Sequence, residues 1–170
     1  MIVCDNSNTK VNMNTLKAGD KAPDFTSTIE TGETVSLKDY KGKKLVVYFY
    51  PKDNTPTCTV EACNIRDGYS ELKSHGIEIL GVSPDSEKKH TNFINKFDLP
   101  FSLIADTEKE LANAFGVWGP KKFMGKISDG IHRTTFIIDE NGTIKHVIDK
   151  VKSKIHTQQI LEALGLVKTA

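Results

Sequence analysis

Two cysteines five positions apart, Cys58 and Cys63, are the side chains of this sequence best suited to covalent chemistry. Cys58 follows Thr55 and Pro56, an order typical of a helix start, because threonine is a common N-cap and proline suits the first helical position. A sulfur in the first helical turn meets unpaired backbone N–H groups and the positive end of the helix dipole. Both stabilise the thiolate, which is the nucleophilic form. The pattern therefore predicts a reactive thiolate at Cys58.

A reactive thiolate is readily oxidised to a sulfenic acid, which condenses with a second thiol to a disulfide. Cys63 is the nearest second thiol. In an unbroken helix its Cα atom would lie about 8.6 Å from that of Cys58, whereas a disulfide requires less than about 7 Å. The disulfide therefore requires local unwinding, and we expect Gly68 and the polar residues 64–67 to make this segment less rigid. The helix is predicted to be folded when reduced and partly melted when oxidised.

Further side chains suit a site for peroxide chemistry. Thr55 carries a hydroxyl within one helical turn of Cys58, and Pro51 restricts the loop that leads to it. Arg133 precedes an apolar strand, and a guanidinium beside the sulfur would stabilise the thiolate and the oxygen that gains charge. Spacing along the chain does not by itself place Arg133 near Cys58. Glu61 is either an acid that complements the helix dipole or a partner of Arg133, and both interpretations stay open.

Apolar periodicity indicates the elements that must position these residues. Apolar runs predict strands over 45–50, 77–82 and 101–105, a hairpin of 134–138 with 143–148, and a short strand and turn over 33–40. Helices are predicted after Thr55, after Ser86, around 111–115 and around 160–164. Strands alternate with helices before the hairpin, which favours a parallel core with an added antiparallel pair. The predicted fold class is α/β, a thioredoxin-like fold with a mixed central sheet flanked by helices on both faces.

The composition is that of an ordinary soluble protein of one domain. The 170 residues are 38% hydrophobic and 26% charged with a net charge of +1, so neither nucleic acid nor a membrane is an expected partner. We expect a polar, disordered lead-in over residues 1–15 and a single domain over residues 16–170. Cys4 is interpreted as an incidental thiol of the lead-in. Three cysteines and no secretory signal favour a reducing compartment, so a cytoplasmic location is expected.

A metal site is a weaker interpretation of the same cysteines. Cys58 and Cys63 with His75 or His90 have the residue types of a zinc site, but a second close pair of ligands is missing. His90 falls on an apolar helical face, which predicts a packed core histidine. We therefore expect neither a metal nor a cofactor. The lysines at 121, 122 and 126 are interpreted as a solvated loop.

The segment from Phe49 to Cys63 resembles the active-site segment of the peroxiredoxins, in particular the bacterioferritin comigratory protein (PrxQ-like) subfamily. The Pro-x-x-x-Thr-x-x-Cys spacing of Pro51, Thr55 and Cys58 is similar to the motif that peroxiredoxins share. The resemblance covers about residues 16–166 and includes the segments 22–25, 81–85, 115–118 and 133–139. Thr57 departs from the subfamily pattern, which more often has glycine there, and a β-branched residue stiffens the turn.

The resemblance implies a thiol peroxidase that reduces hydrogen peroxide and organic hydroperoxides in antioxidant defence. Cys58 would be the peroxidatic cysteine that forms the sulfenic acid, and Cys63 the resolving cysteine that closes an intramolecular disulfide. Thr55 and Arg133 would complete the peroxide site, with Pro51 shielding it. The implied partners are a hydroperoxide and thioredoxin or a similar dithiol reductant, and the implied state is a monomer or weak homodimer.

Two other functions stay open from the residues. A dithiol–disulfide oxidoreductase would act on protein disulfides, but the sequence lacks the Cys-x-x-Cys spacing typical of that exchange. A redox-sensing binding module would use the same oxidation of Cys58 to change a surface that a partner recognises.

Overall fold

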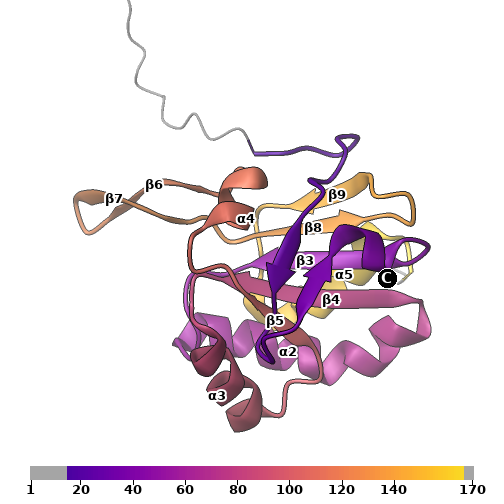
Figure 1. Ribbon diagram of the computed structural model, residues 1–170, viewed down its shortest axis with the longest axis horizontal. Coiled ribbons are helices and arrows are strands. Elements are labelled where there is room, and N and C mark those ends of the chain that lie inside the picture. The colour runs from indigo at the N-terminus through magenta and orange to yellow at the C-terminus, as the bar shows by residue number, and fades with distance from the viewer. Residues whose placement is uncertain (1–14, 167–170) are drawn as a thin grey trace, which may run out of the picture.

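The computed structural model describes residues 15–166, and its centre is a five-stranded mixed sheet (Figure 1). The strand order is β5-β4-β3-β8-β9, formed by Ser102–Ala105, Ile77–Ser83, Lys44–Phe49, Thr134–Ile138 and Ile144–Ile148. β3, β4 and β5 pair in parallel, and the hairpin of β8 and β9 is antiparallel beside β3. The predicted parallel core with an added antiparallel pair is confirmed. Cys4 and residues 1–14 of the predicted lead-in lie outside the described residues.

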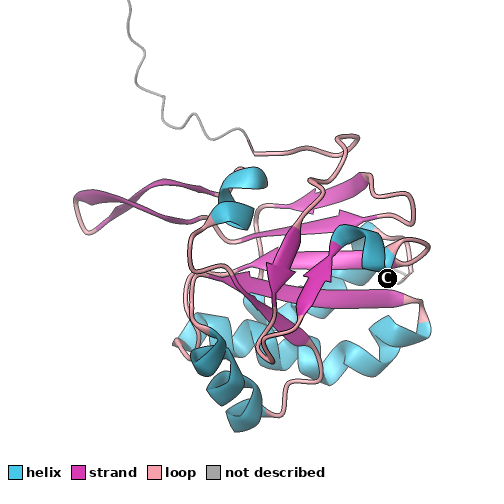
Figure 2. Ribbon diagram, viewed as in Figure 1, coloured by secondary structure: helices cyan, strands magenta, loops and turns pink. Residues whose placement is uncertain are grey.

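Helices cover both faces of this sheet, as expected (Figure 2). α2 (Pro56–Ser74), α3 (Glu87–Phe97) and α5 (His156–Ala163) pack on the face that carries Tyr48 and Ile137. The face with Val47 and Phe136 is covered by α4 (Glu110–Ala114), the 3-10 helix η2 (Leu37–Tyr40) and the pair β1 (Thr26–Thr28) and β2 (Thr34–Ser36). Successive side chains of a strand point to opposite faces, so each central strand contributes to both cores.

Local sequence signals set the ends of the helices. Ser86 caps α3 as predicted, because its Oγ accepts a hydrogen bond from the Lys89 N–H at 3.2 Å. Gly76 follows α2 with a φ of 74°, the left-handed conformation that commonly ends a helix. A second 3-10 helix, η3 (Ser153–Ile155), leads into α5. Within residues 15–166, no helix has the length and apolar character needed to cross a bilayer.

A hairpin projects from the domain where a solvated loop was expected (Figure 1). β6 (Trp118–Phe123) and β7 (Lys126–Ile131) pair antiparallel, so the loop prediction for the lysines at 121, 122 and 126 is wrong. Met124 and Gly125 form the two-residue turn with φ values of 53° and 83°. Tight hairpins require such positive values, which Asn-Gly usually supplies. Methionine gives no such signal, so the sequence did not reveal the turn.

Gly68, which was expected to make α2 less rigid, lies where α2 packs closely against α5. A Cβ atom at this position would lie 2.3 Å from Thr157 Cγ2, at the start of α5. One turn earlier, Asn64 Oδ1 accepts a hydrogen bond from the Thr157 N–H at 2.8 Å, and the Asn64 carbonyl accepts one from the Thr157 hydroxyl at 2.9 Å. These contacts, which we call the Asn64–Thr157 clamp, fix the middle of α2 to α5.

Candidate active site

Cys58 lies in the first turn of α2, which follows the central strand β3, and only 1% of its surface is exposed. Pro56 takes the first helical position and Thr55 the N-cap position, as predicted. The side chain of Thr55 makes no capping bond, however, and its hydroxyl donates to the carbonyl oxygen of Lys52 at 3.1 Å. The fold thus places the sulfur at a helix N-terminus and keeps the Thr55 hydroxyl on the loop before it.

Arg133 connects the sulfur to a second acid. It lies between β7 and β8, where its Nη2 donates to Cys58 Sγ at 3.2 Å and its Nη1 donates to Glu61 Oε1 at 2.5 Å. Burial opposes the charge of Arg133, but Glu61 and Cys58 outweigh this effect and raise its pKa above the ordinary value. The guanidinium therefore remains charged, and the sulfur faces a permanent cation. The structure brings Arg133 and Cys58 together, which spacing alone did not predict.

Glu61 is the acid at the other end of the guanidinium, and the structure supports its interpretation as a partner of Arg133. Its side chain is fully buried. Burial raises the pKa of Glu61 to about 7, although Arg133 opposes the rise. Its second oxygen, Oε2, has no hydrogen-bond partner among residues 15–166 and lies 3.5 Å from His156 Nε2.

His156, the first residue of α5, is a neighbour of the site that the sequence did not reveal. It is fully buried, with Thr135 Oγ1 at 2.7 Å from its Nε2 and Gln159 Oε1 at 3.0 Å from its Nδ1. Burial lowers the pKa of His156 to about 4, so the ring is neutral at neutral pH. The ring packs edge-on against Tyr48, whose buried hydroxyl also lacks a partner in the described chain. The only signal in the sequence was that the polar start of α5 precedes its apolar residues.

A buried network holds the loop that joins β3 to α2. The Tyr50 hydroxyl donates to Asp53 Oδ1 at 2.5 Å, and Asp53 Oδ2 lies 2.6 Å from His90 Nδ1. The Asp53 N–H donates to Asp85 Oδ2 at 2.7 Å, and the other ring nitrogen of His90 bonds a carbonyl of β5 at 2.9 Å. His90 is buried, as predicted, but it also fixes the loop that carries the predicted site residues at 51 and 55. Pro51 in this loop is half-buried.

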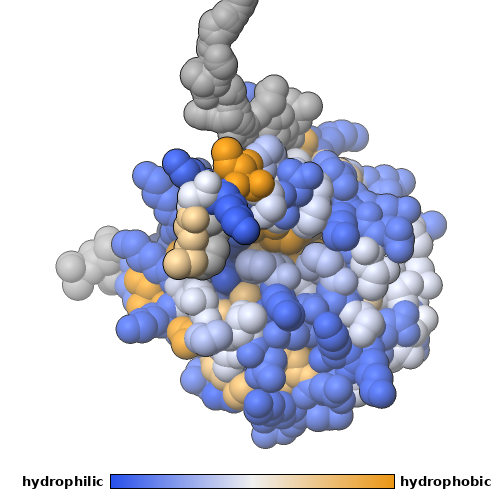
Figure 3. All heavy atoms as spheres, turned by 90° about the vertical axis from the view of Figure 1, so that its left-hand side faces the viewer, coloured by the Kyte–Doolittle hydropathy of each residue, from blue (hydrophilic) through white to orange (hydrophobic). Residues whose placement is uncertain are grey.

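A hollow of about 580 Å³ lies against Arg133. Its other charged or titratable lining residues are Lys121, His132, Lys150 and Asp149, so cations predominate around it. Lys121 is half-buried and donates to the carbonyl of Ile131 at 2.7 Å. Burial, followed by the charge of Arg133, lowers the pKa of Lys121. Figure 3 views the molecule from the side of the β6–β7 hairpin and shows a mainly hydrophilic face, which suits the approach of small polar molecules.

Cys63 lies about one and a half turns beyond Cys58 on α2, where it is half-buried. Both thiols are free, and the helix is continuous between them. The structure therefore corresponds to the reduced protein, in which the sequence predicts a folded helix. Among residues 15–166, no three histidine, cysteine or acidic side chains gather in a way that would hold a metal ion.

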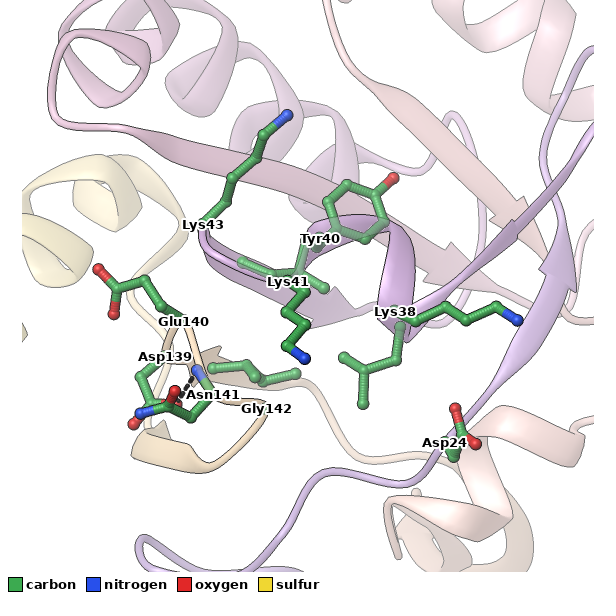
Figure 4. Close-up of a pocket in the computed structure, with 12 residues that line it drawn as sticks. Asp24, Lys38, Tyr40, Lys41, Lys43, Asp139, Glu140, Asn141 and Gly142 are labelled. Carbon is green, nitrogen blue, oxygen red and sulfur yellow. Dashed lines mark hydrogen bonds between the residues drawn. The ribbon is translucent and has the colours of Figure 1, made fainter.

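A second hollow, of about 130 Å³, lies at the other end of β3 (Figure 4). Lysines from the η2–β3 segment line one side, and residues 139–142 line the other. No cysteine borders this hollow, so the thiol chemistry belongs to the site around Cys58.

Known proteins are similar to this chain in sequence and in fold. The model of the AhpC/TSA family matches residues 18–147. A putative peroxiredoxin bcp of Haemophilus influenzae is 51% identical over 152 residues, which cover 89% of this chain and 98% of that protein. The peroxiredoxin Bcp of Escherichia coli is 48% identical over 152 residues, with coverage of 89% and 97%.

Solved structures agree with these sequence relatives. Peroxiredoxin Q of Xanthomonas campestris superposes with a TM-score of 0.81 at 37% identity, covering 87% of this chain and 96% of that chain. A bacterioferritin comigratory protein of the same organism, described for its alkyl peroxide reduction activity, superposes with a TM-score of 0.81 at 36% identity, with coverage of 87% and 97%.

The chain belongs to the AhpC/TSA family. Within that family its relatives are Bcp peroxiredoxins, and its structural neighbours are the PrxQ proteins. The thioredoxin-like fold, expected from the order of strands and helices, and the PrxQ-like type, expected from the resemblance of the sequence, are confirmed.

Proposed function

We propose that this chain is a thiol peroxidase that reduces hydrogen peroxide and organic hydroperoxides through Cys58. The observation that carries the proposal is the contact of Arg133 Nη2 with Cys58 Sγ, at 3.2 Å, in the first turn of a helix. A permanent cation and unpaired N–H groups both stabilise a thiolate. The peroxiredoxin relatives and the alkyl peroxide reduction described for one structural neighbour support the same chemistry.

In the first step, the Cys58 thiolate attacks the terminal oxygen of the hydroperoxide. An S–O bond forms, the O–O bond breaks, and the displaced alkoxide takes up a proton and leaves as an alcohol, or as water from hydrogen peroxide. The sulfur is oxidised to a sulfenic acid while the peroxide is reduced. Arg133 donates towards the place where negative charge passes from sulfur to oxygen, which is where a fixed cation lowers the barrier.

Thr55 and Pro51 complete the proposed peroxide site. The Thr55 hydroxyl is within one helical turn of the sulfur and can bond a peroxide oxygen once that oxygen replaces the Lys52 carbonyl as its acceptor. Pro51 is half-buried in the same loop and shields the sulfur from water. The buried Asp53–His90 pair holds this loop in position.

Cys63 is the proposed resolving residue. Its thiol attacks the sulfenic sulfur of Cys58, the S–O bond breaks, and water leaves as the disulfide forms. α2 must unwind locally for this step, because two Cα atoms five positions apart in a helix lie about 8.6 Å from each other.

A dithiol protein such as thioredoxin is the proposed reductant of this disulfide. Exchange of two thiols for one disulfide returns both cysteines to the reduced state. The sulfurs of Cys58 and Cys63 carry the electrons, so the proposed cycle needs neither a metal nor a cofactor. The proposed state is a monomer or weak dimer, in a reducing compartment such as the cytoplasm that would supply the dithiol.

The test is peroxide consumption with and without a dithiol reductant. Cys58→Ser is expected to abolish consumption. Cys63→Ser is expected to keep one fast oxidation of Cys58 and to slow or alter recycling. Normal steady-state turnover by the Cys58→Ser variant would disprove the proposal. Intact mass and peptide mapping after one equivalent of peroxide would identify the sulfur that becomes oxidised.

A further inference from the structure

Two acids lie at opposite ends of one buried guanidinium. Arg133 contacts Cys58 through Nη2 and Glu61 through Nη1, and the exposed fractions of Cys58 and Glu61 are 1% and 0%. If both acids were ionised, two negative charges would share one cation in a region of low dielectric constant. An uncompensated buried charge is costly, so the site favours one negative charge at a time.

We propose that Glu61 is a positioning residue that holds a proton on Oε2 while Cys58 is ionised, so that the two acids share one proton across Arg133. In this form the guanidinium has a single anionic partner, the thiolate. The sharing of the proton is a property of the resting protein. Its value for catalysis rests on the proposed peroxidase function.

The hydrogen bonds of His156 show which oxygen would carry the proton. Gln159 Oε1 accepts from the Lys152 N–H at 2.8 Å, and Gln159 Nε2 donates to the Lys150 carbonyl at 3.0 Å, so the orientation of this amide is fixed. His156 Nδ1 faces the same Oε1 and must therefore donate to it. In a neutral ring, Nε2 is then an acceptor, and the Thr135 hydroxyl donates to it.

Glu61 Oε2 faces this acceptor nitrogen at 3.5 Å and has no other partner among residues 15–166. The lone pair of His156 Nε2 already accepts from Thr135, so an ionised Oε2 would hold negative charge beside an electron-rich nitrogen that offers it no proton. A proton on Oε2 removes that charge and with it the repulsion. Burial of Glu61, which raises its pKa to about 7, acts in the same direction.

The other charged and titratable groups around Glu61 and Cys58 do not compensate a second negative charge there. Tyr48 on β3 is deeply buried, and burial raises the pKa of its hydroxyl well above the ordinary value, so it is neutral. Lys121 on β6 is a second cation that acts on Arg133 and Cys58, and its amine is bonded to the carbonyl of Ile131. Arg133 is thus the cation that contacts Glu61.

Glu61→Gln separates this role from simple support of Arg133. The amide is uncharged, keeps an oxygen for Arg133 Nη1, and offers an N–H to His156 Nε2. We would follow the ultraviolet absorbance of the Cys58 thiolate against pH, in a background with Cys4→Ser and Cys63→Ser so that one thiol titrates. The midpoint is expected to stay unchanged, because the amide reproduces the neutral Glu61 that accompanies the thiolate. A midpoint lower by about one pH unit would show that an ionised Glu61 opposes the thiolate in the parent chain, and it would overturn the proposal.

Glu71→Gln is the matched control, because Glu71 is an exposed acid on the same helix. It removes an equal charge from α2 and is expected to leave the midpoint unchanged. A ¹³C titration of the Glu61 carboxyl in the unmodified chain gives a second measurement if the glutamine variant does not fold. That signal is expected to stay in its protonated form over the pH range in which the thiolate forms. A carboxyl that is ionised throughout the neutral range would refute the shared proton. Neither measurement uses peroxide, so its outcome is independent of the turnover test.

Discussion

Arg133 Nη2 lies 3.2 Å from Cys58 Sγ, although the two residues are 75 positions apart in the sequence. The same guanidinium also donates to Glu61 from its other nitrogen, so its planar, forked shape matters as much as its charge. Lysine supplies a point charge that cannot serve both acids at once.

Arg133→Lys is therefore expected to slow oxidation of Cys58 by roughly 10²-fold, and Arg133→Met by more. The measurement is the single-turnover rate of Cys58 oxidation at limiting peroxide. Lys150→Met is a suitable control, since Lys150 lines the same hollow and its side chain bonds neither the sulfur nor Glu61. Equal rates for Arg133→Met and the unmodified protein would show that Arg133 has no part in the step.

The Asp53–His90 pair is expected to control both stability and the catalytic loop. His90→Leu leaves Oδ2 of the buried Asp53 carboxyl without its partner, which lowers the free energy of unfolding by about 3 kcal/mol. Urea unfolding measures this change, and the peroxide rate should fall at the same time because the loop that carries Thr55 is released. His90→Leu combined with Asp53→Leu should recover part of the stability and none of the rate. Parallel recovery of both would contradict a role in holding the loop.

The Asn64–Thr157 clamp is expected to limit how far α2 melts on oxidation. Amide exchange of the disulfide form should lose protection over residues 56–63 and keep it beyond Asn64, because Thr157 bonds both the side chain and the carbonyl of Asn64. Asn64→Ala should let the loss of protection spread towards Gly68. If oxidation leaves exchange and far-UV circular dichroism unchanged, the predicted unwinding is wrong.

Stability should depend on pH through Glu61. Its pKa rises from 4.5 to about 7 in the folded chain, so the folded state binds more protons than the unfolded state between these values. The unmodified protein therefore loses stability as pH rises through this window. Glu61→Gln lacks the effect, so its free energy of unfolding relative to the unmodified protein should increase from pH 4.5 to 7, on the order of 2 kcal/mol. Chemical denaturation at several pH values measures the difference, and a flat difference would contradict the raised pKa.

The features that depend on residues close together in the sequence could be predicted from it. Thr55 and Pro56 marked the start of α2, and an apolar run marked β3, so the place of Cys58 at a helix N-terminus followed from local physics. The parallel core, the added antiparallel pair and the layers followed from the alternation of strands and helices, whereas the strand order came from the structure.

Contacts between distant segments could not be predicted in this way. Arg133 was placed near Cys58 only by resemblance, and His156 gave no useful signal, because its partners come from β8 and from α2. The turn at Met124 and Gly125 was missed because methionine seldom adopts a positive φ. The close packing of Gly68 against Thr157 could not be predicted either, since Thr157 lies in another helix.

The two halves of the site are attached to different parts of the fold. Cys58 and Glu61 both lie in the part of α2 that must unwind, whereas Arg133 is anchored at the start of β8. Disulfide formation would therefore withdraw both acids at once and leave the largely buried guanidinium without a negative partner. This unbalanced charge would favour refolding of the helix. Once a reductant cleaves the disulfide, the guanidinium would attract the Cys58 thiolate and return the start of α2 to its reduced conformation.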